Sequence, residues 1–388
     1  MKYIFIKKGG LFRLAISAVL FLLTLEICAR LDDALKYGAP FWGHYSDQLL
    51  RSDDGGMRHN IPNARFEKWQ NNKYGFRGGD FTQAKPEGIT RIVCMGTSES
   101  YGLYESPGKE WPAQLSAMLD IYRKFHVINA SVVGLSIHRY IEYMEKYVYQ
   151  FNPDVIIVLI NPQSYMAHLQ RINLHKDDPP VIELADRGGG GNISPKKIIA
   201  YLRIIPKMKQ MIIRFLPNWL LKRYQILERR KLVESEEKQR LRGERPLDSI
   251  PAEFINQLKA NLAEIIGDIQ KRQIGVILCT YPNLISFDNI QEYPEIFLEG
   301  RRFCVELSYE GMIDASDKVD SLMFDMADRY GIPIADVHRL IPKDTSFFAD
   351  IVHMTDKGAE LMAKSLMDLI LSKYGKGTHK KSDVASGE

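Results

Sequence analysis

Short apolar runs alternate with amphipathic segments from residue 89 onward. The apolar runs are rich in Val and Ile, and the segments between them carry apolar residues at three- and four-residue spacing. The runs predict strands at 91–95, 126–129, 154–160, 275–280 and 332–337, and the spacing predicts helices at 111–123, 137–151, 251–273, 317–330 and 355–374. The third run is apolar nearly throughout, which is typical of a strand buried on both faces. This order predicts an α/β fold, a three-layer α/β/α sandwich with a parallel, flavodoxin-like sheet.

The N-terminus has a different pattern. Basic residues precede an uncharged run at 14–25, and Glu26 and Arg30 follow it. This run is shorter than the roughly 20 residues that cross a bilayer, so flanking residues must extend it. We expect residues 1–31 to form an uncleaved signal-anchor helix, with a cleaved signal peptide or a buried helix as alternatives. Leading positive charge predicts a single-pass protein whose remaining chain lies outside the cytoplasm, in the periplasm or at the cell surface.

The rest of the chain divides by composition. Residues 32–88 are rich in polar residues, Gly and Pro and are expected to be a connecting region, residues 89–374 form the main domain, and the tail at 375–388 is expected to be disordered. A helical insertion at about 166–250 interrupts the domain, and its part at 195–232 is basic and amphipathic. That part suits an anionic membrane surface. A helical cap with a solvated basic face and a site for an anionic polysaccharide are the alternatives.

Composition excludes several classes of function. The chain has 388 residues, of which 45% are hydrophobic and 26% charged, as in folded globular proteins. The formal net charge of +4 is too small to indicate nucleic acid as a partner. Cys94 and Cys279 lie in apolar runs and are expected to be small buried residues. The scattered histidines lack the spacing of a zinc site, so we expect neither a metal nor a cofactor.

The first strand leads into Ser98 within the segment Gly-Thr-Ser-Glu-Ser at 96–100. In parallel sheets, active sites collect at the carboxyl ends of the strands. A serine where a strand turns into a helix exposes its hydroxyl beside unpaired backbone N–H groups, which can stabilise an oxyanion. Serine is also a favoured helix N-cap, so this segment alone does not separate a nucleophile from a cap.

A second pair precedes the last helix. Asp350 lies three residues before His353, and this spacing lets the carboxylate accept a hydrogen bond from one imidazole nitrogen. The other nitrogen then faces the serine as a general base. The alternative is a turn-forming aspartate beside an ordinary surface histidine.

Two further strand ends carry possible oxyanion donors. Gly134 follows the second strand and can present its backbone N–H without a side chain in the way. Asn161 ends the third strand and can donate its side-chain amide. We therefore expect an oxyanion hole made by Ser98, Gly134 and Asn161.

These four segments resemble the sequence blocks of the SGNH (GDSL-like) hydrolase superfamily. Ser98 matches the nucleophile of the first block, Gly134 the glycine of the second, Asn161 the asparagine of the third, and Asp350 with His353 the final Asp-x-x-His block. The resemblance covers residues 89–372, apart from the insertion. The segment Asn-Lys-Tyr-Gly-Phe-Arg-Gly at 72–78 also resembles a stretch that often precedes the core in membrane-anchored, extracytoplasmic bacterial members.

The chain departs from these blocks at three positions. Thr97 replaces the aspartate of the first block, which leaves the nucleophile intact. Leu159 and Pro162 replace the glycine and aspartate around Asn161, so the third block is the weakest. A missing oxyanion donor costs about two to three orders of magnitude in rate.

The resemblance implies hydrolysis of an ester through an acyl-enzyme on Ser98, with O-acetylated carbohydrate or other envelope esters as substrates. An O-acyltransferase of an exported polysaccharide is an alternative, since a sugar hydroxyl can resolve the same intermediate. That route would need a multi-span membrane partner to supply the acyl donor. A third alternative is a non-catalytic assembly protein that keeps the fold.

Overall fold

The computed structural model describes residues 8–43, 45–55, 57–161 and 201–375. Its centre is a five-stranded parallel sheet in the order β6-β5-β7-β8-β9. The strands are β5 (Thr90–Met95), β6 (Phe125–Asn129), β7 (Val155–Leu159), β8 (Gly275–Cys279) and β9 (Ile334–Ala335). This order is that of flavodoxin-like sheets, in which the second strand lies at one edge. Every residue of the central strand β7 is buried, as the apolar run predicted.

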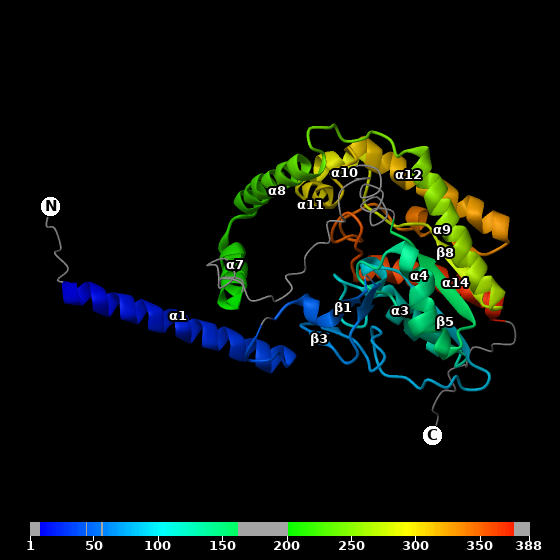
Figure 1. The fold of residues 1–388 in the computed structure, drawn as a ribbon, viewed down its shortest axis with the longest axis horizontal. Coiled ribbons are helices and arrows are strands. Elements are labelled where there is room, and N and C mark those ends of the chain that lie inside the picture. The colour runs from blue at the N-terminus through cyan, green and yellow to red at the C-terminus, as the bar shows by residue number, and fades with distance from the viewer. Residues whose placement is uncertain (1–7, 44, 56, 162–200, 376–388) are drawn as a thin grey trace, which may run out of the picture.

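Helices cover both faces of this sheet (Figure 1). On one face α3 (Trp111–Asp120) packs against α14 (Asp356–Tyr374). On the other lie α4 (Tyr140–Tyr143), α9 (Ala252–Lys271) and α12 (Tyr309–Tyr330). The predicted α/β/α sandwich is therefore confirmed.

Some helices differ from the prediction in extent or kind. The expected helix at 137–151 consists of short 3-10, α and π segments, named η2 (Ile137–Arg139), α4, η3 (Met144–Val148) and η4 (Tyr149–Phe151). Helix α12 begins eight residues before the predicted start at 317, because Ser308 caps it by accepting a hydrogen bond from Gly311 N at 3.1 Å. The pattern did not predict α10 (Phe287–Glu292), α11 (Pro294–Phe303) or α13 (Val337–Leu340).

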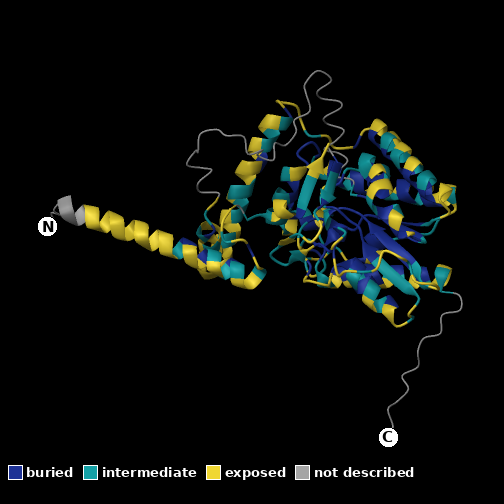
Figure 2. Ribbon diagram, turned by 60° about the horizontal axis from the view of Figure 1, so that its bottom comes forward, coloured by how far each residue is buried: buried dark blue, intermediate teal, exposed yellow. Residues whose placement is uncertain are grey.

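The N-terminal helix α1 (Lys8–Tyr37) projects from the body with most of its described surface exposed (Figure 2). Its length and composition are sufficient to cross a membrane. Two hairpins follow, formed by β1 (Arg51–Asp54) with β2 (Met57–Asn60) and by β3 (Arg65–Phe66) with β4 (Trp69–Gln70). Asn60 Nδ2 donates to Ser131 O at 3.0 Å, so the first hairpin is fixed to the loop after β6.

The described part of the insertion is helical. Helix α7 (Ile204–Phe215) leads into α8 (Asn218–Arg240), which packs on α11. An ion pair of 2.7 Å between Arg301 and Glu237 joins α8 to the domain. The part of the expected insertion at 166–200, and the tail at 376–388, lie outside the described residues.

Candidate active site

Strand β5 ends in a tight turn that presents Ser98. A Cβ on Gly96 would lie 2.2 Å from Ser100 Oγ, so only glycine fits at this point of the turn. Ser98 begins the short helix α2 (Ser98–Tyr101) and is partly exposed, whereas its neighbours Thr97 and Glu99 are buried. The serine is therefore the residue of this turn that faces outward.

The structure brings Asp350 and His353 together in the loop before α14. Asp350 Oδ2 lies 2.7 Å from His353 Nδ1. Its Oδ1 accepts backbone N–H groups from Val352 at 2.9 Å and from His353 at 2.8 Å. These bonds fix both the carboxylate and the imidazole ring, and they leave Nε2 as the ring nitrogen available for a reacting group.

Each partner shifts the protonation of the other. Burial alone would raise the pKa of Asp350, but hydrogen bonds and the charge of His353 outweigh it and lower that pKa. Burial alone would lower the pKa of His353, yet the hydrogen bond and charge of Asp350, with the charges of Glu99 and Glu105, raise it. The pair therefore favours a charged imidazolium, the state that forms when a general base takes a proton.

Among the described residues, His353 Nε2 is buried without a hydrogen-bond partner. The ring centroids of His353 and Tyr104 are 5.0 Å apart, and Tyr104 follows α2 in the chain. Asp356 Oδ1 accepts the backbone N–H of Ser106 at 2.7 Å. These contacts hold the Ser98 segment beside the histidine loop. Hydrogen bonds of catalytic groups are often long before substrate binds, so the unpartnered nitrogen suits a base.

Gly134 and Asn161 lie on the loops that follow β6 and β7. Gly134 has a φ of +75°, which favours glycine, and its neighbour Val132 donates from its N–H to Gly96 O at 3.1 Å, beside the Ser98 turn. Asn161 Nδ2 donates to Glu99 Oε1. The structure thus places both residues around the turn, and their role as oxyanion donors stays a prediction.

Glu99 is a site residue that sequence reasoning missed. Its carboxylate is buried and accepts hydrogen bonds from Thr97 Oγ1 at 2.5 Å, from Tyr281 Oη at 2.6 Å and from Asn161. It therefore joins the ends of β5, β7 and β8. A glutamate on a helix usually faces solvent, so its residue type did not indicate a buried role. Its position next to Ser98 was the one signal in the sequence.

Tyr104 and Glu105 complete the surroundings of His353 and were also missed. Burial, followed by the charge of Asp350 and a hydrogen bond to it, raises the pKa of Tyr104 to about 12. Burial raises the pKa of Glu105 to about 8, although backbone hydrogen bonds and His353 act against this rise. Glu105 Oε1 has no hydrogen-bond partner among the described residues. Burial therefore favours the protonated form of Glu105, which lies close to the imidazole.

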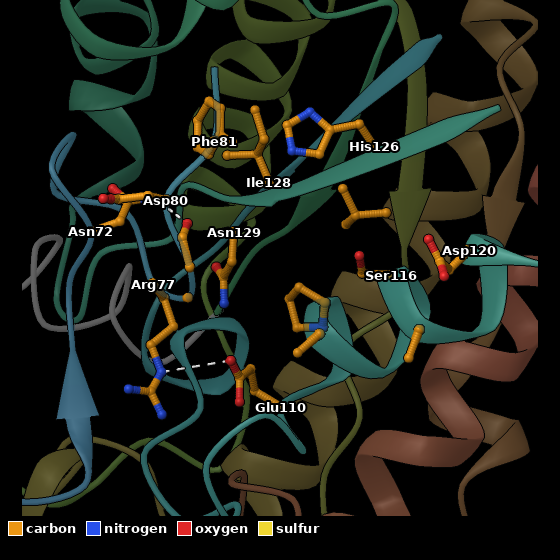
Figure 3. Close-up of a pocket in the computed structure, with 16 residues that line it drawn as sticks. Asn72, Arg77, Asp80, Phe81, Glu110, Ser116, Asp120, His126, Ile128 and Asn129 are labelled. Carbon is orange, nitrogen blue, oxygen red and sulfur yellow. Dashed lines mark hydrogen bonds and ion pairs between the residues drawn. The ribbon is translucent and has the colours of Figure 1, made fainter. Parts of the chain in front are cut away.

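A separate pocket of about 480 Å³ lies between α3, β6 and the segment at 72–81 (Figure 3). Arg77 and Glu110 face each other there with an N–O distance of 3.7 Å. Its lining contains none of Ser98, Asp350 or His353. The pocket is therefore distinct from the candidate active site.

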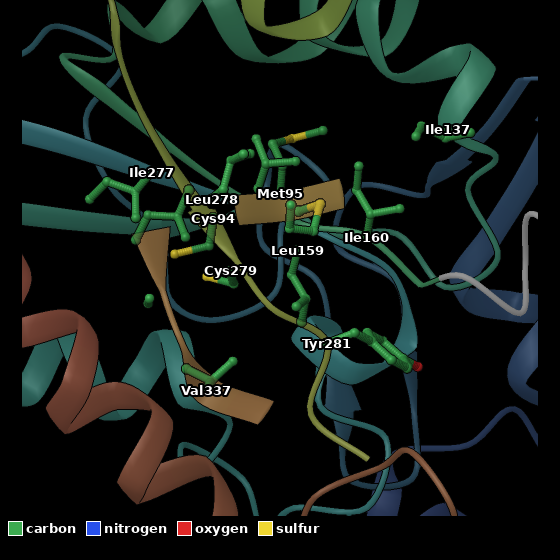
Figure 4. Close-up of a cluster of buried hydrophobic side chains, with 14 of the residues drawn as sticks. Cys94, Met95, Ile137, Leu159, Ile160, Ile277, Leu278, Cys279, Tyr281 and Val337 are labelled. Atoms are coloured by element: carbon green, nitrogen blue, oxygen red, sulfur yellow. The ribbon is translucent and has the colours of Figure 1, made fainter. Parts of the chain in front are cut away.

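Cys94 of β5 and Cys279 of β8 are buried in the hydrophobic core, together with Leu159 and Val337 (Figure 4). Burial raises the pKa of Cys94, which keeps its thiol protonated. Within the described residues, no group of three or more His, Cys, Asp or Glu side chains is arranged to hold a metal ion.

The structure is similar to several solved structures. No family model and no curated protein matches the chain. An acetyl xylan esterase structure is 13% identical with a TM-score of 0.41, covering 72% of this chain and 99% of that one. A lipase/acylhydrolase from Enterococcus faecalis is 14% identical with a TM-score of 0.42, covering 76% and 100%. A GDSL-like lipase from Bacteroides thetaiotaomicron is 12% identical with a TM-score of 0.39, covering 75% and 92%. These names are of the type that the sequence blocks resemble, but at such identities and scores the likeness assigns no role to any residue.

Proposed function

We propose that this chain is a serine esterase that acts through an acyl-enzyme. The observation that carries the proposal is the fixed Asp350–His353 pair, whose Nε2 is buried without a hydrogen-bond partner among the described residues. The contacts Tyr104–His353 and Ser106–Asp356 join its loop to the segment that begins at Ser98. Such a pair is suited to activating a serine hydroxyl, which is a weak nucleophile at its ordinary pKa. No bound cofactor takes part in this reaction.

The reaction has two halves. In the first, Ser98 Oγ attacks the ester carbonyl while His353 Nε2 takes the hydroxyl proton, and the C–O bond of the ester then breaks as the same proton passes to the leaving alcohol. In the second, His353 takes a proton from water, which attacks the acyl-Ser98 carbonyl. The acid is released and the proton returns to Ser98 Oγ. Asp350 orients the imidazole and stabilises its charge in both halves.

The proposed oxyanion donors are the backbone N–H groups of Ser98 and Gly134 and the side-chain amide of Asn161. The bond from Asn161 Nδ2 to Glu99 Oε1 supports this role, because it fixes the orientation of the amide next to the Ser98 turn. Preorganised donors cost no reorganisation when the charge develops.

For the substrate we propose an O-acetyl ester of a carbohydrate outside the cytoplasm. Tyr104 supports this choice, since its ring packs on His353 and 51% of its surface is exposed. An exposed aromatic face beside the base offers a platform for the apolar face of a sugar ring. We propose α1 as the single membrane anchor of this domain, with the positively charged N-terminal side in the cytoplasm.

The test is hydrolysis of an aryl acetate by the wild type, by Ser98→Ala and by Ser106→Ala, which changes an exposed serine of the same loop. We expect Ser98→Ala to lose at least about three orders of magnitude in kcat, and Ser106→Ala to retain full activity. A fluorophosphonate should label Ser98 alone. Unchanged turnover in Ser98→Ala, or no labelling of the wild type, would overturn the proposal.

Adding an oligosaccharide acceptor separates hydrolysis from transfer. Release of free acetate at a rate that does not depend on the acceptor supports an esterase. Ser98-dependent appearance of acetyl groups on the sugar, with loss of free acetate, would make the enzyme an O-acyltransferase and would imply a multi-span partner as donor.

A further inference from the structure

Helix α7 is fixed to α1 by a carboxylate of α1. Glu26 is buried, and its two oxygens accept the backbone N–H groups of Arg203 at 3.1 Å and of Ile204 at 3.0 Å. These are among the N–H groups that the start of a helix leaves without partners. A residue of α1 therefore completes the N-terminus of a helix that lies about 180 residues further along the chain.

Ion pairs strengthen the same junction. Lys207 Nζ lies 2.5 Å from Asp32 Oδ2 and 2.7 Å from Asp33 Oδ1, and Arg203 lies 3.7 Å from Asp33. All of these α1 residues lie within eight residues after the uncharged run at 14–25. If α1 crosses a bilayer, this junction marks the level at which it leaves the acyl chains.

The opposite side of α7 is apolar and is exposed in the described part of the structure. Ile205, Met208, Ile212 and Phe215 recur at three- and four-residue spacing, which places them on one face, and none of the residues of α7 is buried. The exposed fraction reaches 83% at Phe215. Trp219, in the first turn of the next helix α8, has an exposed fraction of 68%. A row of exposed apolar side chains on one helix face indicates an interaction site.

Exposed basic residues border this face. Arg214 and Arg223 are exposed, and neither forms an ion pair within the described part of the chain. Lys207 faces the acids of α1. Arg214 lies seven residues later on the same side of α7 and borders the apolar surface at Met211, which is exposed and three residues before it. An apolar face bordered by basic side chains is the arrangement of helices that lie in the headgroup layer of anionic membranes.

We propose that the interfacial segment, residues 204–220, lies on the surface of the bilayer that α1 crosses, with its apolar face on the acyl chains. The proposal rests on the proposed anchoring by α1. Figure 1 supports the geometry, because α7 runs across the direction of α1 at the end nearest the body. A helix that crosses the membrane and a helix that lies on it require this arrangement.

The segment also fixes the height of the active site. Helix α8 has 23 residues, which corresponds to roughly 34 Å, and it runs from the interfacial segment to the domain. It is held there by Lys222–Glu295 and Arg229–Glu299, both at 3.2 Å. In addition to burial, the charge of Glu299 raises the pKa of Tyr104, and the charge of Arg229 lowers it. The ring of Tyr104 packs beside His353. The chain is therefore attached to the membrane at two points, with the second one linked to the rim of the active site.

The test places a fluorophore on a cysteine of the full-length protein in nanodiscs of phosphatidylcholine and phosphatidylglycerol. A Cys28→Ser background removes the exposed cysteine, since the three other cysteines are buried. Labels are attached at Phe215→Cys on the segment, Leu22→Cys on α1 and Ile121→Cys on the far domain surface, all at exposed positions. We expect doxyl-labelled lipid to quench the first two at least about twofold and to leave the third unchanged.

Each other outcome has a definite meaning. A label at Phe215→Cys that iodide quenches as it does Ile121→Cys, with no effect of doxyl lipid, would overturn the proposal, because the segment would face water. A label shielded from both quenchers would also overturn it, because protein would cover the face. A label at Leu22→Cys that doxyl lipid does not quench would refute the anchoring by α1, independently of any esterase activity.

The charge contribution is tested by Arg214→Glu with Arg223→Glu. We expect quenching at Phe215→Cys to fall in anionic nanodiscs but not in purely zwitterionic ones. The matched control is Lys271→Glu with Lys364→Glu, which changes the net charge equally at exposed positions of the domain. Equal loss in both double variants would show a general charge effect and would overturn the role of the basic border.

Discussion

His353 owes its protonation to neighbouring side chains. Burial would lower its pKa, and the hydrogen bond and charge of Asp350, with the charge of Glu99, raise it instead. A general base must be neutral to act, so activity should fall as the pH drops through a pKa above the ordinary value near 6.5. The position of the acid limb in the pH–rate profile therefore measures the pKa that these neighbours give to His353.

Asp350→Asn removes the partner that raises this pKa. We expect the acid limb of kcat/KM to move to lower pH, because burial then dominates, and kcat to fall by about 10³- to 10⁴-fold as the imidazole loses its orientation. Rate profiles of an aryl acetate between pH 5 and 9 measure both effects. Asp344→Asn, in an exposed turn of the same loop, is the control that should leave the limb in place. An unmoved limb in Asp350→Asn would contradict the assignment.

Glu105 makes stability depend on pH in a predictable direction. Its pKa is about 8 in the folded chain, because burial disfavours the charged carboxylate. In the unfolded chain it titrates near its ordinary value of about 4.3. Between these values the folded state holds a proton that the unfolded state has released, so this residue makes stability fall as pH rises from about 4.3 to about 8.

Glu105→Gln should therefore stabilise the protein at pH 8 by on the order of 2 kcal/mol or more and have little effect at pH 4. Urea unfolding at both pH values measures the difference. Glu87→Gln changes an exposed glutamate and should show no such dependence. A Glu105→Gln variant whose stability differs from the wild type equally at both pH values would refute the raised pKa.

At the scale of elements, the site depends on how loops leave the strands. Gly134 combines a φ of +75° with close packing, since an added Cβ would lie 2.5 Å from Arg58 Nη1 of the β2 strand. Arg58 pairs with Asp53 across the first hairpin at 3.0 Å. The hairpin thus packs on the loop that carries a proposed oxyanion donor.

Gly134→Ala is expected to destabilise the protein by about 1–2 kcal/mol and to lower kcat, because the backbone N–H must shift. Gly79→Ala is the matched control, with open space around the added Cβ and an ordinary φ, and it should change stability by less than about 0.5 kcal/mol. Arg58→Ala in the Gly134→Ala background should recover only part of the loss, since it removes the contact and leaves the φ strain. Thermal unfolding and turnover of these three variants and the wild type measure these effects. Full recovery would mean that the φ strain is negligible.

At the scale of the whole molecule, the proposal to test is that α1 anchors the domain outside the cytoplasm. We expect the full-length chain to stay in the membrane pellet after washing with alkaline carbonate and to keep its N-terminus. Added protease should digest the domain from outside intact spheroplasts. Mass spectrometry of the recovered chain distinguishes an anchor from a cleaved signal peptide. A chain found in the supernatant, or a mature form without residues 1–31, would contradict the proposed single-pass topology.

The sequence by itself determined the parallel sheet, because the pattern of strands and helices is local: β7 is an unbroken apolar run, and each amphipathic helix repeats at its own period. It also placed Asp350 and His353 together, since three residues in a loop are enough to bring the two groups into hydrogen-bonding distance. The predicted start of α12 was wrong by eight residues, because the cap at Ser308 precedes the clearly periodic part of the helix.

Only the tertiary structure decided how distant segments meet. The bond from Tyr281 to Glu99 joins residues 182 positions apart, and the cap from Glu26 to α7 joins residues 178 apart. The spacing of apolar residues within one helix or strand does not predict such contacts. The burial that raises the pKa of Glu105 likewise comes from the fold around it. If the same glutamate were exposed to solvent, its pKa would have the ordinary value. Spacing along the chain thus determined the strands, most of the helices that cover the sheet and the contact between Asp350 and His353. Packing between elements decided the charge states and the position of α7 against α1.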